Sequence, residues 1–271
     1  MPFWMKYGLD REHGGVYTCV NRDGSLMDTT KSVWFQGRFG FIAAYAYNNI
    51  EKNPQWLAAS KSCIDFIEAH CFDTDGHMFF EVTEDGKPLR KRRYVFSEGF
   101  AAIAMAEYAL ATGEKEYAKK ALDIFKRTLH FLNTPGFLEP KYLPTLPSRG
   151  HSITMILINT ASRIRMVIDD PSLTEQIDTS IAALRKYFIH PEFKALLEMV
   201  GPDGEFIDTC NGRVINPGHC IETAWFIMEE AKYRNWDKDL LQLALQILDW
   251  SWEWGWDKEF GGIINFRDCR N

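Results

Sequence analysis

A histidine and a carboxylate lie close together near residue 219, where the sequence predicts the start of a helix. Pro217 and Gly218 interrupt the chain, and the apolar run after them predicts a helix with His219 in its first turn. Glu222 follows three residues later on the same face. An imidazole beside a carboxylate suits proton transfer, because its pKa can sit near neutrality. A structural, hydrogen-bonding histidine has the same pattern, so this stretch alone supports both interpretations.

A single arginine, Arg38, interrupts the nearly apolar segment 30–50, which predicts a buried helix. A buried arginine needs a partner, because its charge cannot be neutralised and its desolvation is costly. It can form a structural ion pair, or it can clamp an anion or a hydroxyl group inside a cavity. The residues alone leave both roles open.

Further polar side chains occur at the starts of other apolar segments. Glu98 begins the segment that runs to residue 109, and His151 begins the segment 151–168. Packing does not account for so many polar groups on apolar helices, and the pattern favours the lining of a polar ligand pocket. The set consists of Arg38, Glu98, His151, His219 and Glu222.

Apolar and amphipathic segments alternate along the chain. The apolar ones described above are expected to be inner helices, and the amphipathic ones are expected to be outer helices with one wet face. Glycine-containing turns between them predict short β-hairpins at one end. Two concentric helix layers indicate an all-α toroid, formed by residues 1–271 as one domain. The expected outer helices follow Pro54 and cover 115–132, 171–188 and 238–252.

Two distant segments share one pattern. Residues 257–264 match residues 10–17 at the aspartate, the glutamate and both glycines. This similarity predicts an internal repeat.

Composition narrows the classes of partner. The net charge of −6 gives no reason to expect nucleic acid or an anionic membrane surface. No apolar run is long enough to span a bilayer, so membrane insertion is not expected. The six cysteines form no paired CxxC spacing and no zinc pattern, which favours free thiols in a reducing cytoplasm.

Four motifs, spread in order over nearly the whole chain, carry a family resemblance. They are residues 9–15 (Leu-Asp-Arg-Glu-His-Gly-Gly), 34–38 (Trp-Phe-Gln-Gly-Arg), 96–102 (Phe-Ser-Glu-Gly-Phe-Ala-Ala) and 216–219 (Asn-Pro-Gly-His) with Glu222 and Trp225. The chain thereby resembles the N-acylglucosamine 2-epimerase family, which includes renin-binding proteins, cellobiose 2-epimerases and aldose–ketose isomerases. The resemblance implies an (α/α)6 toroid that is cytoplasmic, homodimeric and active on free sugars without a metal.

The resemblance also implies roles for single residues. His219 matches a general acid/base histidine, and Arg38 matches the arginine that polarises the C1 and C2 oxygens of the open-chain sugar. Glu222 matches a carboxylate that contacts the substrate or orients the site. The residues expected to bind substrate are Trp34, Glu98, His151 and Trp225, with Trp34 stacking on the sugar and His151 implicated in ring opening or binding.

Epimerisation at C2 asks for these residue types. The C2 proton is acidic because the adjacent aldehyde can take up charge as an enediolate, which a cation stabilises while a neutral histidine takes the proton. Return of the proton from the opposite face calls for a second base. In the family this is a histidine in a helix beyond the last glycine-rich hairpin, whereas this sequence stops at Asn271.

The first helix is also represented only by its tail, so a full toroid would need on the order of a hundred further residues. We therefore expect an incomplete toroid, from either a fragment of a longer gene or a shortened homologue.

The predicted function is a sugar 2-epimerase that interconverts N-acetylglucosamine and N-acetylmannosamine. The alternatives are a mannose isomerase, a cellobiose 2-epimerase, or a catalytically impaired sugar-binding protein that lacks the second histidine. No cofactor is expected to be required. The resemblance allows activation by a nucleotide such as ATP, although the sequence contains no phosphate-binding loop.

Overall fold

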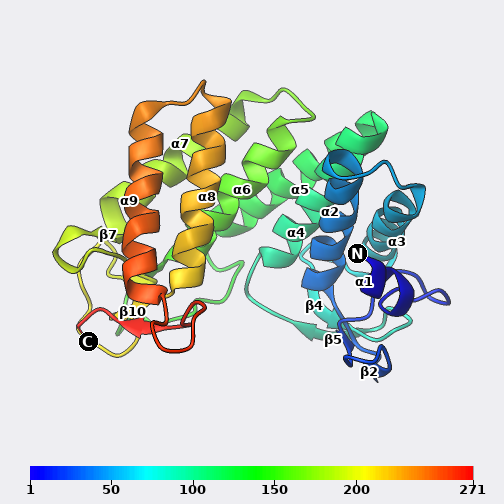
Figure 1. The fold of residues 1–271 in the computed structure, drawn as a ribbon, viewed down its shortest axis with the longest axis horizontal. Helices are drawn as coiled ribbons and strands as arrows, with labels where there is room; N and C mark the ends of the chain where they lie inside the picture. The colour runs from blue at the N-terminus through cyan, green and yellow to red at the C-terminus, as the bar shows by residue number, and fades with distance from the viewer. Residues whose placement is uncertain (271) are drawn as a thin grey trace. The chain divides into compact units, whose positions relative to one another are not determined.

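The computed structural model describes residues 1–270, and its contacts group them into two compact units (Figure 1). Unit 1 consists of Met1–Pro140 and Arg163–Asp170. Unit 2 consists of Lys141–Ser162 and the chain from Pro171 onward. The assignment of residues 1–271 to one domain stays a prediction.

Unit 1 is built around a buried helix. Helix α4 is buried along most of its length and packs against both α2 and the amphipathic α5. Helix α2 packs in turn against α3. Closely spaced small residues allow this packing, as at Gly37, where a β-carbon would lie only 2.6 Å from the backbone of Phe100. The helices of this unit are α1 (Pro2–Tyr7), α2 (Val33–Asn49), α3 (Pro54–His70), α4 (Phe96–Thr112) and α5 (Lys115–Asn133).

The prediction that α2 is buried all round is wrong. Phe35 is 45% exposed and Ile42 is 48% exposed, and Arg38 is also exposed. The buried face of α2 carries mainly its small residues, among them Gly37 and Gly40. Because Arg38 is exposed, it does not carry the desolvation cost that the sequence argument assumed.

Short antiparallel strands precede the helices of unit 1. Strands β1 (Cys19–Val20) and β2 (Leu26–Asp28) form one hairpin. Strand β3 (Lys31–Ser32), directly before α2, pairs with β4 (Phe79–Val82), which pairs with β5 (Pro88–Lys91) before α4. The predicted hairpins are thus present.

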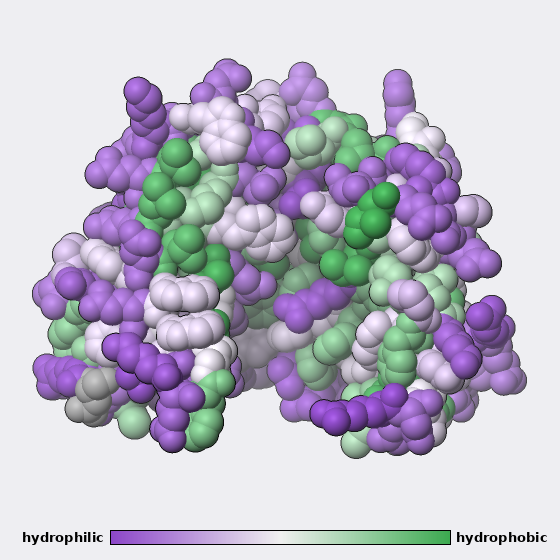
Figure 2. Space-filling view, viewed as in Figure 1, coloured by the Kyte–Doolittle hydropathy of each residue, from purple (hydrophilic) through white to green (hydrophobic). Residues whose placement is uncertain are grey.

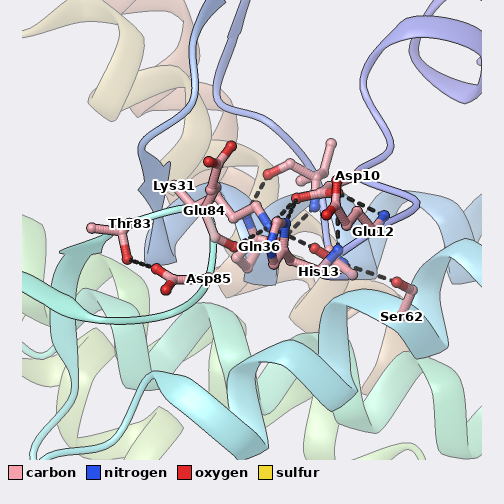
Figure 3. A network of polar contacts seen from close by, with 12 residues as sticks. Asp10, Glu12, His13, Lys31, Gln36, Ser62, Thr83, Glu84 and Asp85 are labelled. Carbon is pink, nitrogen blue, oxygen red and sulfur yellow. Dashed lines mark hydrogen bonds and ion pairs between the residues drawn. The ribbon is translucent and has the colours of Figure 1, made fainter.

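A buried lysine ties the first loop of unit 1 to this sheet (Figure 3). The Lys31 ammonium is fully buried and donates to Asp10 Oδ2 at 2.7 Å and to the carbonyl oxygens of Gly14 and Glu84 at 2.8 Å. Gln36 of α2 exchanges two hydrogen bonds with the backbone of Val16. This group, which we call the Lys31 clasp, gives the motif at residues 9–15 a structural role.

Unit 2 combines helices with short strands that hold its loops together. Helices α8 and α9 pack against each other, and α7 continues into a π-helical turn at Leu184–Phe188. The strand pairs are β6–β9, β7–β8 and β10–β11. The elements are β6 (Arg149–Gly150), α6 (His151–Arg165, of which residues 163–165 belong to unit 1), α7 (Pro171–Ala183), β7 (Ile189–His190), β8 (Ala195–Leu196), β9 (Met199–Val200), β10 (Val214–Ile215), α8 (Pro217–Tyr233), α9 (Lys238–Gly255) and β11 (Arg267–Asp268).

The two segments that look alike in sequence fold into the same loop. The Asp10 carboxylate accepts from the backbone N–H groups of residues 12 and 13, and the Asp257 carboxylate accepts from those of residues 259 and 260. Each loop also has two successive glycines with positive φ, at 14–15 and at 261–262. The predicted internal repeat is therefore confirmed at these two loops.

Hydrophobic side chains are exposed among hydrophilic ones over α8 and α9 of unit 2 (Figure 2). They include Trp225, Leu245 and Trp252, each between 44% and 49% exposed. Within residues 1–270, no helix combines the length and the apolar character that crossing a membrane requires.

Candidate functional site

The start of α8 places His219 as the sequence predicts. The Asn216 side chain caps the helix by accepting from the His219 backbone N–H at 3.2 Å, and Pro217 occupies the first turn. A capping asparagine and an early proline both favour a helix start at this position. The His219 side chain is 36% exposed, so its ring is accessible from solvent.

Glu198 orients the His219 ring. The His219 Nδ1–H donates to both oxygens of Glu198, at 3.0 and 3.2 Å. Burial alone would raise the pKa of Glu198, but its interactions with His151 and His219 lower it to about 2. Glu198 is therefore a carboxylate at neutral pH. A neutral His219 ring with its proton on Nδ1 carries its lone pair on Nε2, the nitrogen able to take a proton.

His151 lies beside His219, with ring centroids 6.4 Å apart, and is fully buried. Thr223 uses its hydroxyl proton to donate to the His219 carbonyl oxygen at 2.8 Å, so it accepts from His151 Nε2–H at 2.9 Å. His151 Nδ1 makes no hydrogen bond within residues 1–270 and lies 3.7 Å from Glu198 Oε2, within ion-pair range. The ring is thus held in one tautomer.

Backbone hydrogen bonds also hold these residues in place. The His151 N–H donates to the Glu198 carbonyl oxygen at 3.0 Å, beside the β6–β9 pair. The Glu198 N–H donates to Val214 of β10 at 3.0 Å. We call His151, Glu198 and His219 the His–Glu–His triad; it lies within unit 2, and its ligand-type atoms are all within 4.8 Å of one another, close enough to hold one metal ion.

In unit 1, the predicted site residues Trp34 and Arg38 meet on one aromatic ring. Trp34 lies edge-on to Phe100 with ring centroids 5.9 Å apart, and the Arg38 guanidinium lies 4.3 Å from the centroid of the same ring. Phe80 and Phe96 also pack against Trp34. Arg38 thus has a cation–π partner in Phe100, beside a half-buried tryptophan.

Glu98 takes part in a buried pair at the start of α4. Its Oε1 lies 2.5 Å from His77 Nδ1 and accepts from the Met78 N–H at 2.7 Å. His77 Nε2 donates to the Arg92 carbonyl oxygen at 2.8 Å. Glu98 Oε2 is buried and makes no hydrogen bond within residues 1–270. These contacts tie β4 and the segment after β5 to α4, and substrate binding by Glu98 stays a prediction.

Comparison with known proteins places this chain in a family. A sequence model described as N-acylglucosamine 2-epimerase (GlcNAc 2-epimerase) matches residues 15–271. The chain belongs to the N-acylglucosamine 2-epimerase family. The N-acylglucosamine 2-epimerase of Rattus norvegicus is 30% identical over 278 residues, which cover 99% of this chain and 66% of the rat protein. That of Homo sapiens is 30% identical over 280 residues, covering 100% of this chain and 65% of the human protein.

The chain therefore spans about two thirds of the length of its mammalian relatives in the N-acylglucosamine 2-epimerase family. Solved structures agree on the fold. Cellobiose 2-epimerase from Bacillus thermoamylovorans has a TM-score of 0.85 at 21% identity, covering 99% of this chain and 72% of that chain. A D-mannose isomerase has a TM-score of 0.78 at 19% identity, covering 100% of this chain and 72% of that chain. The predicted all-α fold class of the (α/α)6 toroid is confirmed.

The remaining predicted site residues of this epimerase-family chain lie on α8. Glu222 is half-buried, and Trp225 is 44% exposed and packs against Phe226. The carboxylate that accepts the hydrogen bond from His219 Nδ1–H belongs to Glu198. The sequence argument had paired His219 with Glu222 instead.

Sequence reasoning missed both Glu198 and Thr223. Glu198 had a usable signal, because it is the one charged residue in the otherwise apolar stretch 195–200. The same reasoning singled out Arg38 in its helix. Thr223 had no such signal, since a threonine inside a helix is common.

Proposed function

We propose that this chain provides the proton-transfer site of a sugar 2-epimerase acting on the pair N-acetylglucosamine and N-acetylmannosamine. One observation carries the proposal: Glu198 holds His219 Nδ1–H, which leaves the lone pair of the neutral ring on Nε2. The names of the mammalian relatives favour this sugar pair.

The chemistry follows from the arrangement of His219 and Glu198. His219 Nε2 removes the proton from C2 of the open-chain sugar, and the electrons move into the C1 carbonyl to give an enolate, because C2 of these sugars carries an acetamido group. The imidazolium that forms remains hydrogen-bonded to the ionised Glu198, which stabilises its charge. Return of a proton from water or from a second acid to the opposite face of C2 gives the epimer. The family resemblance implies that Arg38 stabilises the enolate oxygen, which stays a prediction.

Proton exchange at C2 tests the proposal, because it requires only one base. N-acetylmannosamine and N-acetylglucosamine are incubated with the protein in deuterium oxide, and loss of the C2 proton signal is followed by NMR. We expect His219→Ala to lower the exchange rate by about 10²–10⁴-fold. His190→Gln is the matched control, since His190 pairs with Glu192 outside the triad. Undiminished exchange in His219→Ala would contradict the assignment.

Substrate choice is tested in the same assay with mannose and cellobiose as further substrates. Faster exchange on either sugar would favour the isomerase or the disaccharide epimerase. Sugar binding without exchange on any of them would favour the impaired sugar-binding protein.

We further propose that the protein acts in the cytoplasm as a homodimer, needs no cofactor, and can be activated by ATP. The family resemblance of the motifs is the support for these features. Light scattering after size-exclusion chromatography tests the dimer, and the exchange assay with and without ATP tests activation.

A further inference from the structure

The His–Glu–His triad has the composition of a transition-metal site as well as that of a proton-transfer site. Two imidazoles and one carboxylate are a common set of zinc ligands, which leaves a fourth position open. We propose that His151, Glu198 and His219 bind one divalent transition-metal ion of the zinc class through the two Nδ1 atoms and the carboxylate. Binding of this ion goes beyond the proposed reaction, which needs no metal.

The spacing of the ligand atoms suits one ion. Ligands held at about 2 Å from a tetrahedral zinc ion lie roughly 3.3 Å from one another. Glu198 Oε2 lies 3.0 Å from His219 Nδ1 and 3.7 Å from His151 Nδ1, so the two distances bracket that value. All three ligand atoms lie within 4.8 Å of one another, and side-chain shifts would close the remaining distance to bring them onto one ion.

The buried Nδ1 atom of His151 is the feature that points most directly to a bound metal ion. Its Nδ1 is fully buried, directed at Glu198, and has no hydrogen bond within residues 1–270. Thr223 accepts the Nε2 proton, which keeps the Nδ1 lone pair available in the neutral ring. A hydrogen bond on the far nitrogen is the support that metal-binding histidines usually have.

Metal binding and base catalysis exclude each other at His219. A metal on Nδ1 displaces the proton that Glu198 now holds, and the neutral ring then carries its proton on Nε2. If the proposed function holds, Nε2 is the nitrogen that must take the substrate proton. A bound ion therefore blocks the base, and C2 exchange falls in proportion to occupancy.

Calorimetric titration tests the binding independently of activity. The untagged protein is stripped with EDTA and titrated with zinc chloride, in a Cys19→Ser/Cys210→Ser background because these two thiols are exposed. We expect one equivalent of zinc to bind, and Glu198→Gln and His151→Gln each to lose this binding. Thr223→Val, which keeps all three ligands, should bind about 10–100-fold more weakly.

Two control variants keep the result specific. His130→Gln removes an exposed histidine and His190→Gln removes a second histidine–glutamate pair, and both should bind zinc like the parent. Failure of the parent to take up zinc would overturn the proposal, as would unchanged affinity in Glu198→Gln and His151→Gln. Zinc uptake in a protein without C2 exchange would support the metal site and count against the proposed function alone.

Discussion

At the scale of single residues, buried polar groups divide into those with all their partners and those with an unused atom. Lys31 uses all three of its ammonium protons inside unit 1. His151 keeps Nδ1 without a hydrogen bond inside unit 2. The first condition is typical of a structural residue and the second of a ligand site, because an unsatisfied buried group costs free energy.

Lys31→Met should lower the free energy of unfolding of unit 1 by ~3–5 kcal/mol, because it leaves the buried Asp10 carboxylate without its cation. Urea titration measures this change. The control is Lys61→Met, which removes an exposed pair with Asp65 and should cost less than about 1 kcal/mol. Equal costs for the two variants would show that the Lys31 clasp is not a structural element.

Glu198→Gln should lower the rate constant kcat for C2 exchange by about 10²-fold and change KM little. The amide can still accept from His219 Nδ1–H, but it carries no charge to stabilise the imidazolium. Exchange kinetics at several sugar concentrations separate kcat from KM. Glu198→Asp, which keeps the charge on a shorter side chain, should recover part of the rate. A rise in KM alone would instead assign Glu198 to substrate binding.

The residue scale also shows how far the sequence predicts the site. The position of His219 could be predicted, because Asn216, Pro217 and Gly218 are local helix-start signals. Its partner could not, because Glu198 is 21 residues away and reaches the ring only through the β6–β9 and β10 backbone contacts. Arg38 was expected to be buried because its neighbours are apolar, yet apolar residues such as Phe35 are exposed as well.

At the scale of elements, the helices of unit 1 depend on close approach between α2 and α4. A side chain at Gly37 would meet backbone atoms of Phe100, which cannot rotate away as a side chain would. Apolar and amphipathic periodicity predicts the order and type of these helices. It does not predict that a single glycine sets their separation, because that depends on which residue lies opposite.

Gly37→Ala should therefore destabilise unit 1 by ~1–3 kcal/mol, although alanine favours a helix over glycine by about 1 kcal/mol. The added β-carbon would lie 2.6 Å from the Phe100 carbonyl carbon, so steric repulsion decides the sign. Thermal unfolding measures the change. Gly218→Ala is the control: its nearest neighbour is Asn216 Oδ1 at 3.4 Å, and it should be near neutral. A stabilised Gly37→Ala would show that the two helices separate easily.

The buried pair between His77 and Glu98 should make unit 1 less stable as the pH rises. Burial disfavours the imidazolium, but the Glu98 hydrogen bond and charge and the Arg92 carbonyl outweigh it, so the pKa of His77 is raised above its usual 6.5. The stabilisation is then fully present below about pH 6.5 and is lost as the pH rises through the raised pKa.

Thermal midpoints of the parent and of His77→Gln between about pH 5.5 and 9 measure this dependence. We expect the largest gap between the two proteins at the acidic end and a smaller gap at the alkaline end. A gap that does not change with pH would mean that His77 is neutral in the folded protein.

At the scale of the whole molecule, the thiols report on how well both units are packed. Cys63 and Cys71 are buried in unit 1, and Cys220 is buried in unit 2. Burial raises the pKa of the Cys63 thiol to about 12 and also raises the pKa values of the other two. The thiolate is the reactive form, so these side chains are both inaccessible and unreactive while the units stay folded.

We expect a thiol-specific disulfide reagent to modify two cysteines rapidly in the native protein, the exposed Cys19 and Cys210. The other four should react only as fast as their unit opens, so Lys31→Met should speed up Cys63 and Cys71 and leave Cys220 unchanged. In guanidinium chloride all six should react, since all six are free thiols. Mass spectrometry of tryptic peptides assigns each site. Rapid modification of Cys220 in the folded parent would contradict the packing of α8 around the candidate site, whereas fewer than six reactive thiols after unfolding would contradict the prediction of a reduced chain.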